Sequence, residues 1–194
     1  MSEHSPIEAA AAAVSVEDEN ALLRASLADA QARIRELEQL VDSDMLTGLP
    51  NRRRFEAELE RVVGHCDRHG TSAAVLQVDL NGLEGINRRH GRFAGDAALI
   101  DVAKLLSALI RTTDMVARTG GDEFCLILDR LDHNSAIETA ERLTRCIAQH
   151  RVDLGASEVA VEASVATTCV FPGDTAAGVM LRVGRNLAVA KGEI

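Results

Sequence analysis

The stretch Arg118-Thr119-Gly120-Gly121-Asp122-Glu123-Phe124 decides how this chain is interpreted, because two glycines are followed directly by two acids and an apolar run. Residues 116–118 and 124–128 have the composition of short strands. A glycine pair between strands indicates a hairpin, since glycine accepts a positive φ without steric cost. The exposed glycine backbone would admit a ligand, and the two carboxylates would supply the hard oxygen ligands that magnesium prefers. The alternative is an acidic surface turn that only solvates the hairpin.

A second acidic segment follows another predicted strand. Residues 72–78 are rich in Ala, Val and Leu, which is typical of a buried strand, and Asp79-Leu80-Asn81-Gly82 comes next. A carboxylate at the end of a central strand is well placed for ligand chemistry, although Asp79 could simply cap the next element. If the hairpin pairs beside this strand, Asp79 and Asp122 can converge on a pair of cations. That arrangement suits two-metal phosphoryl transfer.

Three separate motifs give the chain a resemblance to a known family. Besides Gly120 to Phe124, the segment 44–53 reads DMLTGLPNRR, and the segment 79–96 carries Asn87, Gly91, Gly95 and Asp96 in register. Together they resemble, in order, the motifs of the GGDEF family of diguanylate cyclases, which join two GTP molecules into cyclic di-GMP. The resemblance covers about residues 42–194. Three ordered motifs are far more specific than one.

The resemblance implies a role for each motif residue. It implies a divalent cation, Mg²⁺ or Mn²⁺, at the side chains of Asp79 and Asp122 and the carbonyl of Leu80, with Glu123 as a further ligand or base. By the same resemblance, Asn87 and Asp96 would bind the guanine base. Gly120, Gly121 and Lys191 would bind the phosphates. Asp122 and Glu123 would be the catalytic residues. For Asn87 and Asp96 the alternative is capping of two flanking helices, at residues 83–90 and 97–110.

A further pair resembles the family's inhibitory RxxD site. Arg111 and Asp114 lie shortly before Gly120, and the resemblance implies that cyclic di-GMP binds there and inhibits its own synthesis. Arginine can clamp phosphate or guanine acceptors, and aspartate accepts from guanine. Outside this framework the pair would be an ordinary exposed ion pair.

Some positions depart from the family pattern. Asn81 stands where the family has aspartate, and Glu84 stands where it has a lysine that faces the triphosphate. Glutamate repels phosphate, whereas Arg88 and Arg92 bring positive charge close by, in place of an aspartate and a histidine. These changes favour weaker phosphate binding.

The C-terminal alignment adds to that expectation. Lys191 resembles the family's terminal lysine, and the arginine expected four residues later would lie beyond Ile194. Aligning on Gly184-Arg185-Asn186 instead would put Leu181 at the lysine, so we prefer Lys191, whose distance from Ser164 suits the family. The competing prediction is therefore a weak or inactive domain that acts as a cyclic di-GMP or GTP receptor, or as a signalling scaffold.

The predicted organisation has three parts. Residues 1–15 are expected to be a disordered leader, residues 16–43 a coiled-coil dimerisation helix, and residues 44–194 the GGDEF domain. By resemblance the domain is α+β, with a central, mostly antiparallel sheet flanked by helices, as in nucleotide cyclase and polymerase palm domains. Residues 159–168 are expected to form another core strand and residues 175–190 the closing helix.

Residues 16–41 carry a heptad seam of apolar side chains. The seam comprises Val16, Asn20, Leu23, Leu27, Ala30, Ile34, Leu37 and Val41. In a parallel homodimer the flanking pairs Glu19 with Arg24 and Arg33 with Glu38 would have opposite charges, and a buried asparagine favours a dimer in one register. The alternative is one amphipathic helix that packs on the domain. The helix could also bind an unidentified protein partner.

Composition limits the class of protein. The net charge of -9 opposes an extended nucleic-acid surface. The four cysteines form no CxxC pair, which favours reduced thiols and a cytoplasmic location. No apolar run is long enough for a membrane span. With four Phe and no Trp or Tyr, the core must consist mainly of Leu, Val, Ile and Ala.

Overall fold

The computed structural model describes residues 19–31, 33, 41–154 and 158–194. The chain divides into two compact units, Met1–Val41 and Asp42–Ile194. In the first unit the described residues 19–31 and 33 are helical, with exposed Leu22, Leu23 and Leu27. Three members of the predicted seam, Val16, Ile34 and Leu37, lie outside the described residues. The coiled coil and the 1–15 leader therefore stay predictions.

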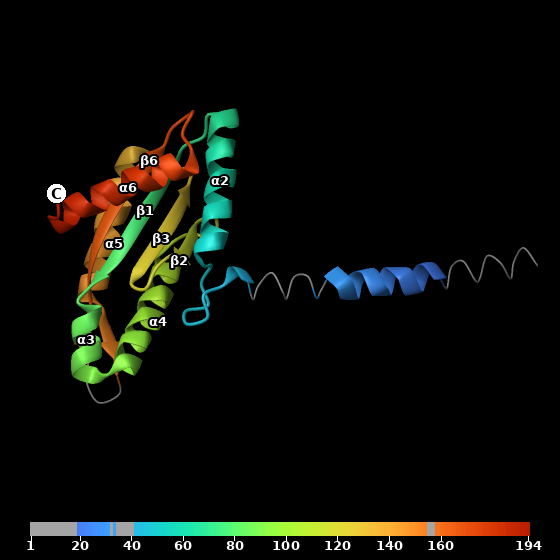
Figure 1. The fold of residues 1–194 in the computed structure, drawn as a ribbon. Helices are drawn as coiled ribbons and strands as arrows, with labels where there is room; N and C mark the ends of the chain where they lie inside the picture. Colours follow the sequence, from blue (N-terminus) through green and yellow to red (C-terminus); the bar gives the residue numbers. More distant parts are fainter. Residues whose placement is uncertain (1–18, 32, 34–40, 155–157) are drawn as a thin grey trace, which may run out of the picture. The chain divides into compact units, whose positions relative to one another are not determined.

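The second unit is built on an antiparallel sheet with the strand order β2-β3-β1-β6 (Figure 1). Its strands are β1 (Ala73–Asn81), β2 (Met115–Arg118), β3 (Glu123–Asp129) and β6 (Glu162–Val170). The predicted hairpin is confirmed, because β2 pairs with β3, and β3 in turn pairs with the central strand β1. The register places Asp79 directly opposite Glu123.

Helices cover both faces of this sheet (Figure 1). They are α2 (Arg52–His69), α3 (Leu83–His90), α4 (Arg92–Leu109), α5 (His133–Gln149) and α6 (Ala176–Lys191). Alternate residues of β1 face opposite sides, as strand geometry requires: Leu76 joins the core beneath α4 and α5, and Val75 joins the core beneath α2 and α6. The predicted α+β class, with an antiparallel sheet flanked by helices, is confirmed.

Both cores are largely aliphatic, as the composition predicts. The exceptions are Phe55 and Phe124, which are fully buried on opposite sides of the sheet. Helices α2 and α6 begin at polar caps: the side chain of Asn51 accepts a hydrogen bond from the Arg54 amide, and that of Thr175 accepts one from the Gly178 amide.

Three element predictions need correction. The segment 159–168 is not one strand: β5 (Glu158–Ala160) pairs with β4 (Arg151–Asp153) in a separate small sheet, and β6 begins at Glu162. Strand β1 continues past Val78 to Asn81, so Asp79 lies within it. Helix α4 begins at Arg92 rather than at residue 97. Asp96 is therefore inside the helix and is not its N-cap. Among the described residues, no helix is long and apolar enough to cross a membrane.

Candidate nucleotide site

The hairpin loop between β2 and β3 has a different geometry from the predicted tight turn. Its amides at Thr119 and Gly120 both donate to the Glu123 carbonyl, at 2.9 and 3.3 Å. Neither Gly120 nor Gly121 has a positive φ. A Cβ on Gly120 would lie 2.9 Å from Oε2 of Glu123, and one on Gly121 would meet nothing within 4 Å. A side chain at position 120 would therefore displace Glu123, whereas the backbone conformation itself does not favour glycine.

The acidic segments of β1 and β3 meet as the sequence predicts. The Leu80 amide donates to the Asp122 carbonyl at 3.0 Å, so Asp122 lies immediately beside β1. Lys191 brings a cation to the same edge, with Nζ 3.2 Å from Oδ1 of Asp79. Hydrogen bonds to Asp79 and Glu193 raise the pKa of Lys191 above its ordinary value. Lys191 is predicted from the family resemblance to bind the phosphates, and its contact with Asp79 has no signal in the sequence.

Glu123 is held by two side chains that sequence reasoning missed. Gln77, two residues before Asp79 on β1, donates an amide hydrogen bond to Oε1 of Glu123. Arg52 lies 3.9 Å from Oε2 and also donates to the Thr119 carbonyl at 2.9 Å. The position of Arg52 in the 44–53 motif is the one signal that could have identified it. These contacts fix the Glu123 carboxylate against the hairpin loop.

The donor set at this edge suits a hard divalent cation. It consists of the carboxylates of Asp79 and Asp122 and the carbonyl of Leu80, all of them oxygen donors. Within the described residues, no three His, Cys, Asp or Glu side chains are grouped closely enough to hold a metal by themselves. Magnesium usually binds through one or two carboxylates together with water and substrate phosphates, so a set of this size fits it.

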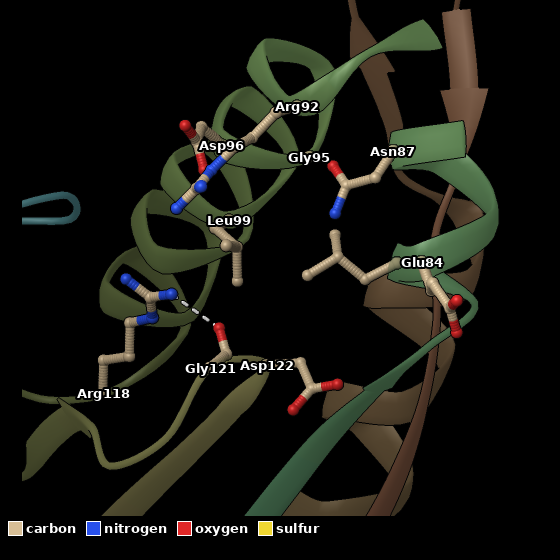
Figure 2. A pocket seen from close by; sticks show the side chains of 10 residues that line it. Glu84, Asn87, Arg92, Gly95, Asp96, Leu99, Arg118, Gly121 and Asp122 are labelled. Atoms are coloured by element: carbon tan, nitrogen blue, oxygen red, sulfur yellow. Dashed lines mark hydrogen bonds between the residues drawn. The ribbon is translucent and has the colours of Figure 1, made fainter. Parts of the chain in front are cut away.

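A cavity of about 510 Å³ opens between the hairpin loop and helices α3 and α4. Its lining includes Asn87, Arg92, Asp96, Gly121 and Asp122. Figure 2 shows Arg92 and Asp96 on α4 at one end of the cavity, with Gly121 and Asp122 at the other. The predicted guanine-binding residues thus share one cavity with Gly121 and Asp122. Asp79, Gly120 and Lys191 are not among the residues that line it.

Asn87 has an unsatisfied polar atom at this cavity. Its Oδ1 is buried and has no hydrogen-bond partner. The side chain packs over Gly95, where an added Cβ would lie only 2.0 Å from Oδ1. The carboxylate of Asp96, one residue further, forms no hydrogen bond or ion pair with any described residue. A buried carbonyl oxygen without a donor is unfavourable, so this end of the cavity is suited to a ligand that brings donors.

Arg118 joins the hairpin to the start of the domain. Its Nη1 lies 3.1 and 3.2 Å from the two oxygens of Asp44, and its Nη2 donates to the Gly121 carbonyl at 2.5 Å. Burial alone would raise the pKa of Asp44, but hydrogen bonds from Thr47 and the charge and hydrogen bond of Arg118 together hold that pKa below its ordinary value. This role of Arg118, the residue that precedes Thr119-Gly120-Gly121, could not be predicted from the motif.

The predicted inhibitory pair lies outside the cavity. Asp114 accepts from the Arg111 amide at 3.0 Å and from the Asp129 amide at 3.2 Å. The guanidinium of Arg111 is exposed and forms no ion pair with any described residue. The alternative of an ordinary ion pair between these two side chains is therefore wrong, and Asp114 instead closes the turn between α4 and β2.

Comparison with known proteins identifies the family. The sequence model described as diguanylate cyclase, GGDEF domain, matches residues 41–193. The chain is 39% identical over 159 residues to MucR of Pseudomonas aeruginosa, a bifunctional diguanylate cyclase/cyclic di-GMP phosphodiesterase, which covers 82% of this chain and 22% of MucR. It is 40% identical over 116 residues to the diguanylate cyclase TpbB of the same species, covering 58% of this chain and 26% of TpbB. The chain thus spans about a quarter of the length of these relatives.

Solved structures share the fold. A sensory box/GGDEF family protein from Caulobacter crescentus has a TM-score of 0.72 at 32% identity, covering 79% of this chain and 99% of that one. The coiled coil and GGDEF domain of DgcB from Caulobacter crescentus, solved with c-di-GMP, has a TM-score of 0.82, and the match covers 92% of this chain and 95% of that one. At 23% identity this match shows likeness of fold alone. Since the family model matches most of the chain, the protein belongs to the family of the diguanylate cyclase GGDEF domain.

Proposed function

We propose that this protein is a diguanylate cyclase, which condenses two GTP molecules into cyclic di-GMP and pyrophosphate. The observation that carries the proposal is the buried, unpartnered Oδ1 of Asn87 in a cavity that also holds the free carboxylate of Asp96 and, at its other end, Asp122. Guanine has donors at N1 and N2, which suit these two acceptors. The relatives MucR and TpbB, named as diguanylate cyclases, support the same activity.

The chain's own residues would bind and orient the nucleotide. Asn87 and Asp96 hold the base, while Gly120 and Gly121 leave the hairpin backbone open to the phosphates. Asp79, Asp122 and the Leu80 carbonyl would hold Mg²⁺ or Mn²⁺, which when bound would neutralise phosphate charge and activate the attacking 3′-oxygen.

Glu123 is already positioned for a supporting role. Its contacts with Gln77 and Arg52 hold its carboxylate at the loop, which supports the proposed role of a further ligand or base. Lys191 neutralises Asp79 in the absence of a ligand, and we expect it to turn to the terminal phosphates when GTP binds. Most of the rate would come from positioning and electrostatics.

A complete reaction requires two domains. The described cavity suits one nucleotide, and the 3′-hydroxyl of one GTP must reach the α-phosphorus of another. The proposed parallel homodimer through residues 16–41 would raise the effective concentration of one half-site for the other. The exposed side chains of Leu23 and Leu27 support a partner for this helix. A monomer in sedimentation at micromolar concentration would contradict the dimer.

Product inhibition through Arg111 and Asp114 is the second part of the proposal. The free guanidinium of Arg111 is available for a ligand, since Asp114 bonds to the Arg111 amide and not to its side chain. Arg111→Ala should therefore weaken cyclic di-GMP inhibition about tenfold without a change in the free energy of unfolding. Asp114→Ala is a poorer test, because it also removes two backbone hydrogen bonds. An unchanged inhibition constant in Arg111→Ala would contradict this site.

The alternative function is a receptor for cyclic di-GMP or GTP. The observation in its favour is Glu84, a carboxylate in the cavity lining where the family resemblance implies a lysine. Product analysis by liquid chromatography and mass spectrometry separates the two functions. Wild type, Asp122→Asn and the control Glu60→Gln, an exposed acid on α2, would be incubated with GTP and Mg²⁺, with a phosphodiesterase present to remove inhibiting product.

The two functions predict different products. A cyclase gives cyclic di-GMP, or its linear breakdown product, from wild type and Glu60→Gln but at least about a hundredfold less from Asp122→Asn. No product from any variant, at concentrations that ensure dimers, would reject the cyclase and leave the receptor.

A further inference from the structure

The nucleotide cavity has more acids than available cations. Its charged lining consists of three acids, Glu84, Asp96 and Asp122, and two arginines, Arg92 and Arg118. Arg118 is occupied, because both of its Nη atoms bond within the fold to Asp44 and Gly121. The guanidinium of Arg92 forms no hydrogen bond or ion pair with any described residue. Arg92 is thus the available cation among the residues that line the cavity.

Arg92 lies beside the carboxylate that would bind the base. It is the first residue of α4, and Asp96 follows one helical turn later on the same face. Figure 2 shows the two side chains together at one end of the cavity, with Asn87 across from them and Gly121 at the opposite end. The cation is therefore at the base end and not at the phosphate end next to the hairpin loop.

The chemistry of guanine calls for a donor at this place. A carboxylate such as Asp96 can accept only from N1 and N2, which leaves the neighbouring acceptors O6 and N7 of the base unmatched. The planar fork of arginine fits these two atoms, and this pair is the commonest specific arginine contact to guanine. Adenine has an amino group in place of O6, so an arginine here would disfavour it.

We propose that Arg92 is a specificity-determining residue that donates to O6 and N7 of the bound guanine. The inference rests on the proposed function, because it assumes that a guanine nucleotide occupies this cavity. Arg92 thereby extends recognition from the edge read by Asp96 and Asn87 to the neighbouring edge of the base. The same contact places a positive charge over the base end of an otherwise acidic cavity.

The test compares two nucleotides that differ at one atom. The probes are 2′,3′-dideoxyguanosine triphosphate and its 7-deaza analogue, both of which lack the 3′-hydroxyl and cannot react. Their dissociation constants would be measured by calorimetry with Mg²⁺ for wild type, Arg92→Ala and the control Arg88→Ala. The family pattern suggested that Arg88 brings positive charge near the phosphates, but the structure places Arg88 on the exposed surface of α3, outside the lining of the cavity.

The expected result has two parts. Arg92→Ala should bind the guanine probe about tenfold more weakly than wild type, whereas Arg88→Ala should stay within about twofold. Wild type should bind the 7-deaza probe several-fold more weakly than the guanine probe, and Arg92→Ala should bind both probes equally. If wild type prefers the guanine probe to the 7-deaza probe and Arg92→Ala does not, Arg92 contacts the edge of the base that carries N7.

Other results overturn the inference. An equal loss of affinity for both probes in Arg92→Ala, with the N7 preference retained, would mean that Arg92 contacts phosphate. If Arg92→Ala loses no affinity for the guanine probe, Arg92 does not contact the nucleotide. If Arg88→Ala loses as much affinity as Arg92→Ala, the effect of Arg92 is one of general charge. If wild type binds neither probe, the proposed function itself is rejected. If wild type binds the guanine probe and Arg92→Ala binds it with the same affinity, only the role of Arg92 is rejected.

Discussion

The two sides of the cavity between the hairpin loop and helices α3 and α4 differ in how their polar groups are satisfied. On the side that we call the clamp, Asp44, Arg118 and the Gly121 carbonyl bond to one another, and of their side-chain polar atoms only Nε of Arg118 is buried without a partner. On the side that we call the reader, the side chains of Asn87, Arg92 and Asp96 form no hydrogen bond or ion pair with any described residue. The difference indicates that the clamp shapes the cavity, whereas the side chains of the reader are available to bind a ligand.

The clamp contributes to stability because its charges are mostly buried. The side chains of Arg118 and Asp44 are 13% and 22% exposed. Removal of one partner from such a pair leaves the other charge poorly solvated, which costs more than the pair itself contributes. Removal of a polar side chain from the reader should not destabilise the fold, because these side chains form no hydrogen bonds within the described residues.

The largest expected effect is on the clamp. Arg118→Met keeps most of the side-chain volume but removes the hydrogen bonds to Asp44 and Gly121. We expect a loss of about 2 kcal/mol in the free energy of unfolding, measured by urea denaturation. The control Arg88→Met removes an exposed charge and should change stability by less than about 0.5 kcal/mol. A loss below about 1 kcal/mol in Arg118→Met would show that the clamp is not structural.

A smaller effect is expected where the reader is tightly packed. In Gly95→Ala the new Cβ would lie 2.0 Å from Oδ1 of Asn87, so the Asn87 amide must shift from its position in the cavity lining. We expect roughly tenfold weaker binding of the dideoxyguanosine probe in calorimetry. The control Gly85→Ala adds a Cβ that meets only the end of Arg89, at 3.7 Å. It should leave binding unchanged and stabilise the helix by up to about 1 kcal/mol. Equal binding by both variants would contradict the placement of Asn87.

The reader and the clamp should respond to mutation with opposite signs. Asn87→Leu removes the buried oxygen that lacks a donor and fills a similar volume. The free energy of unfolding should stay the same or rise by up to about 1 kcal/mol, while the nucleotide probe binds about tenfold more weakly. Urea denaturation and calorimetry on one preparation would measure both. A clear loss of stability would mean that Asn87 has a structural partner in solution, and the contrast between the two sides would fail.

The sequence predicted those parts of the site that depend on local pattern. The strand that contains Asp79 and the strand that follows Asp122 are rich in apolar residues, and the pairing of β3 with β1 places the two acids at one edge of the sheet, as expected. The predicted start of α4 was wrong because its first turn gives a weak apolar pattern: Phe93 is 90% exposed, and only the small residues Ala94 and Gly95 are buried there. Gly91, rather than Asp96, precedes the helix.

The contacts that the sequence could not predict join distant parts of the chain. Asp44 and Arg118 are 74 residues apart, and no spacing rule connects them. The contact of Lys191 with Asp79 depends on how α6 crosses the sheet, and the link from Gln77 to Glu123 depends on the register of β1 and β3. Each of these contacts is set by tertiary packing, which motif spacing does not contain.

The smallest expected effect is the pH dependence of the clamp. Since the pKa of Asp44 in the folded protein is below its ordinary value of 3.8, its contribution to stability is complete above about pH 4 and is lost as the pH falls through the lowered pKa. Asp44→Asn should therefore be less stable than wild type at pH 6, and the difference should shrink between pH 4 and pH 3. Urea midpoints across this range measure it, with Glu60→Gln as the control. A difference that stays constant down to pH 3 would mean that Asp44 acts through its shape and hydrogen bonds, and that its charge does not contribute to the clamp.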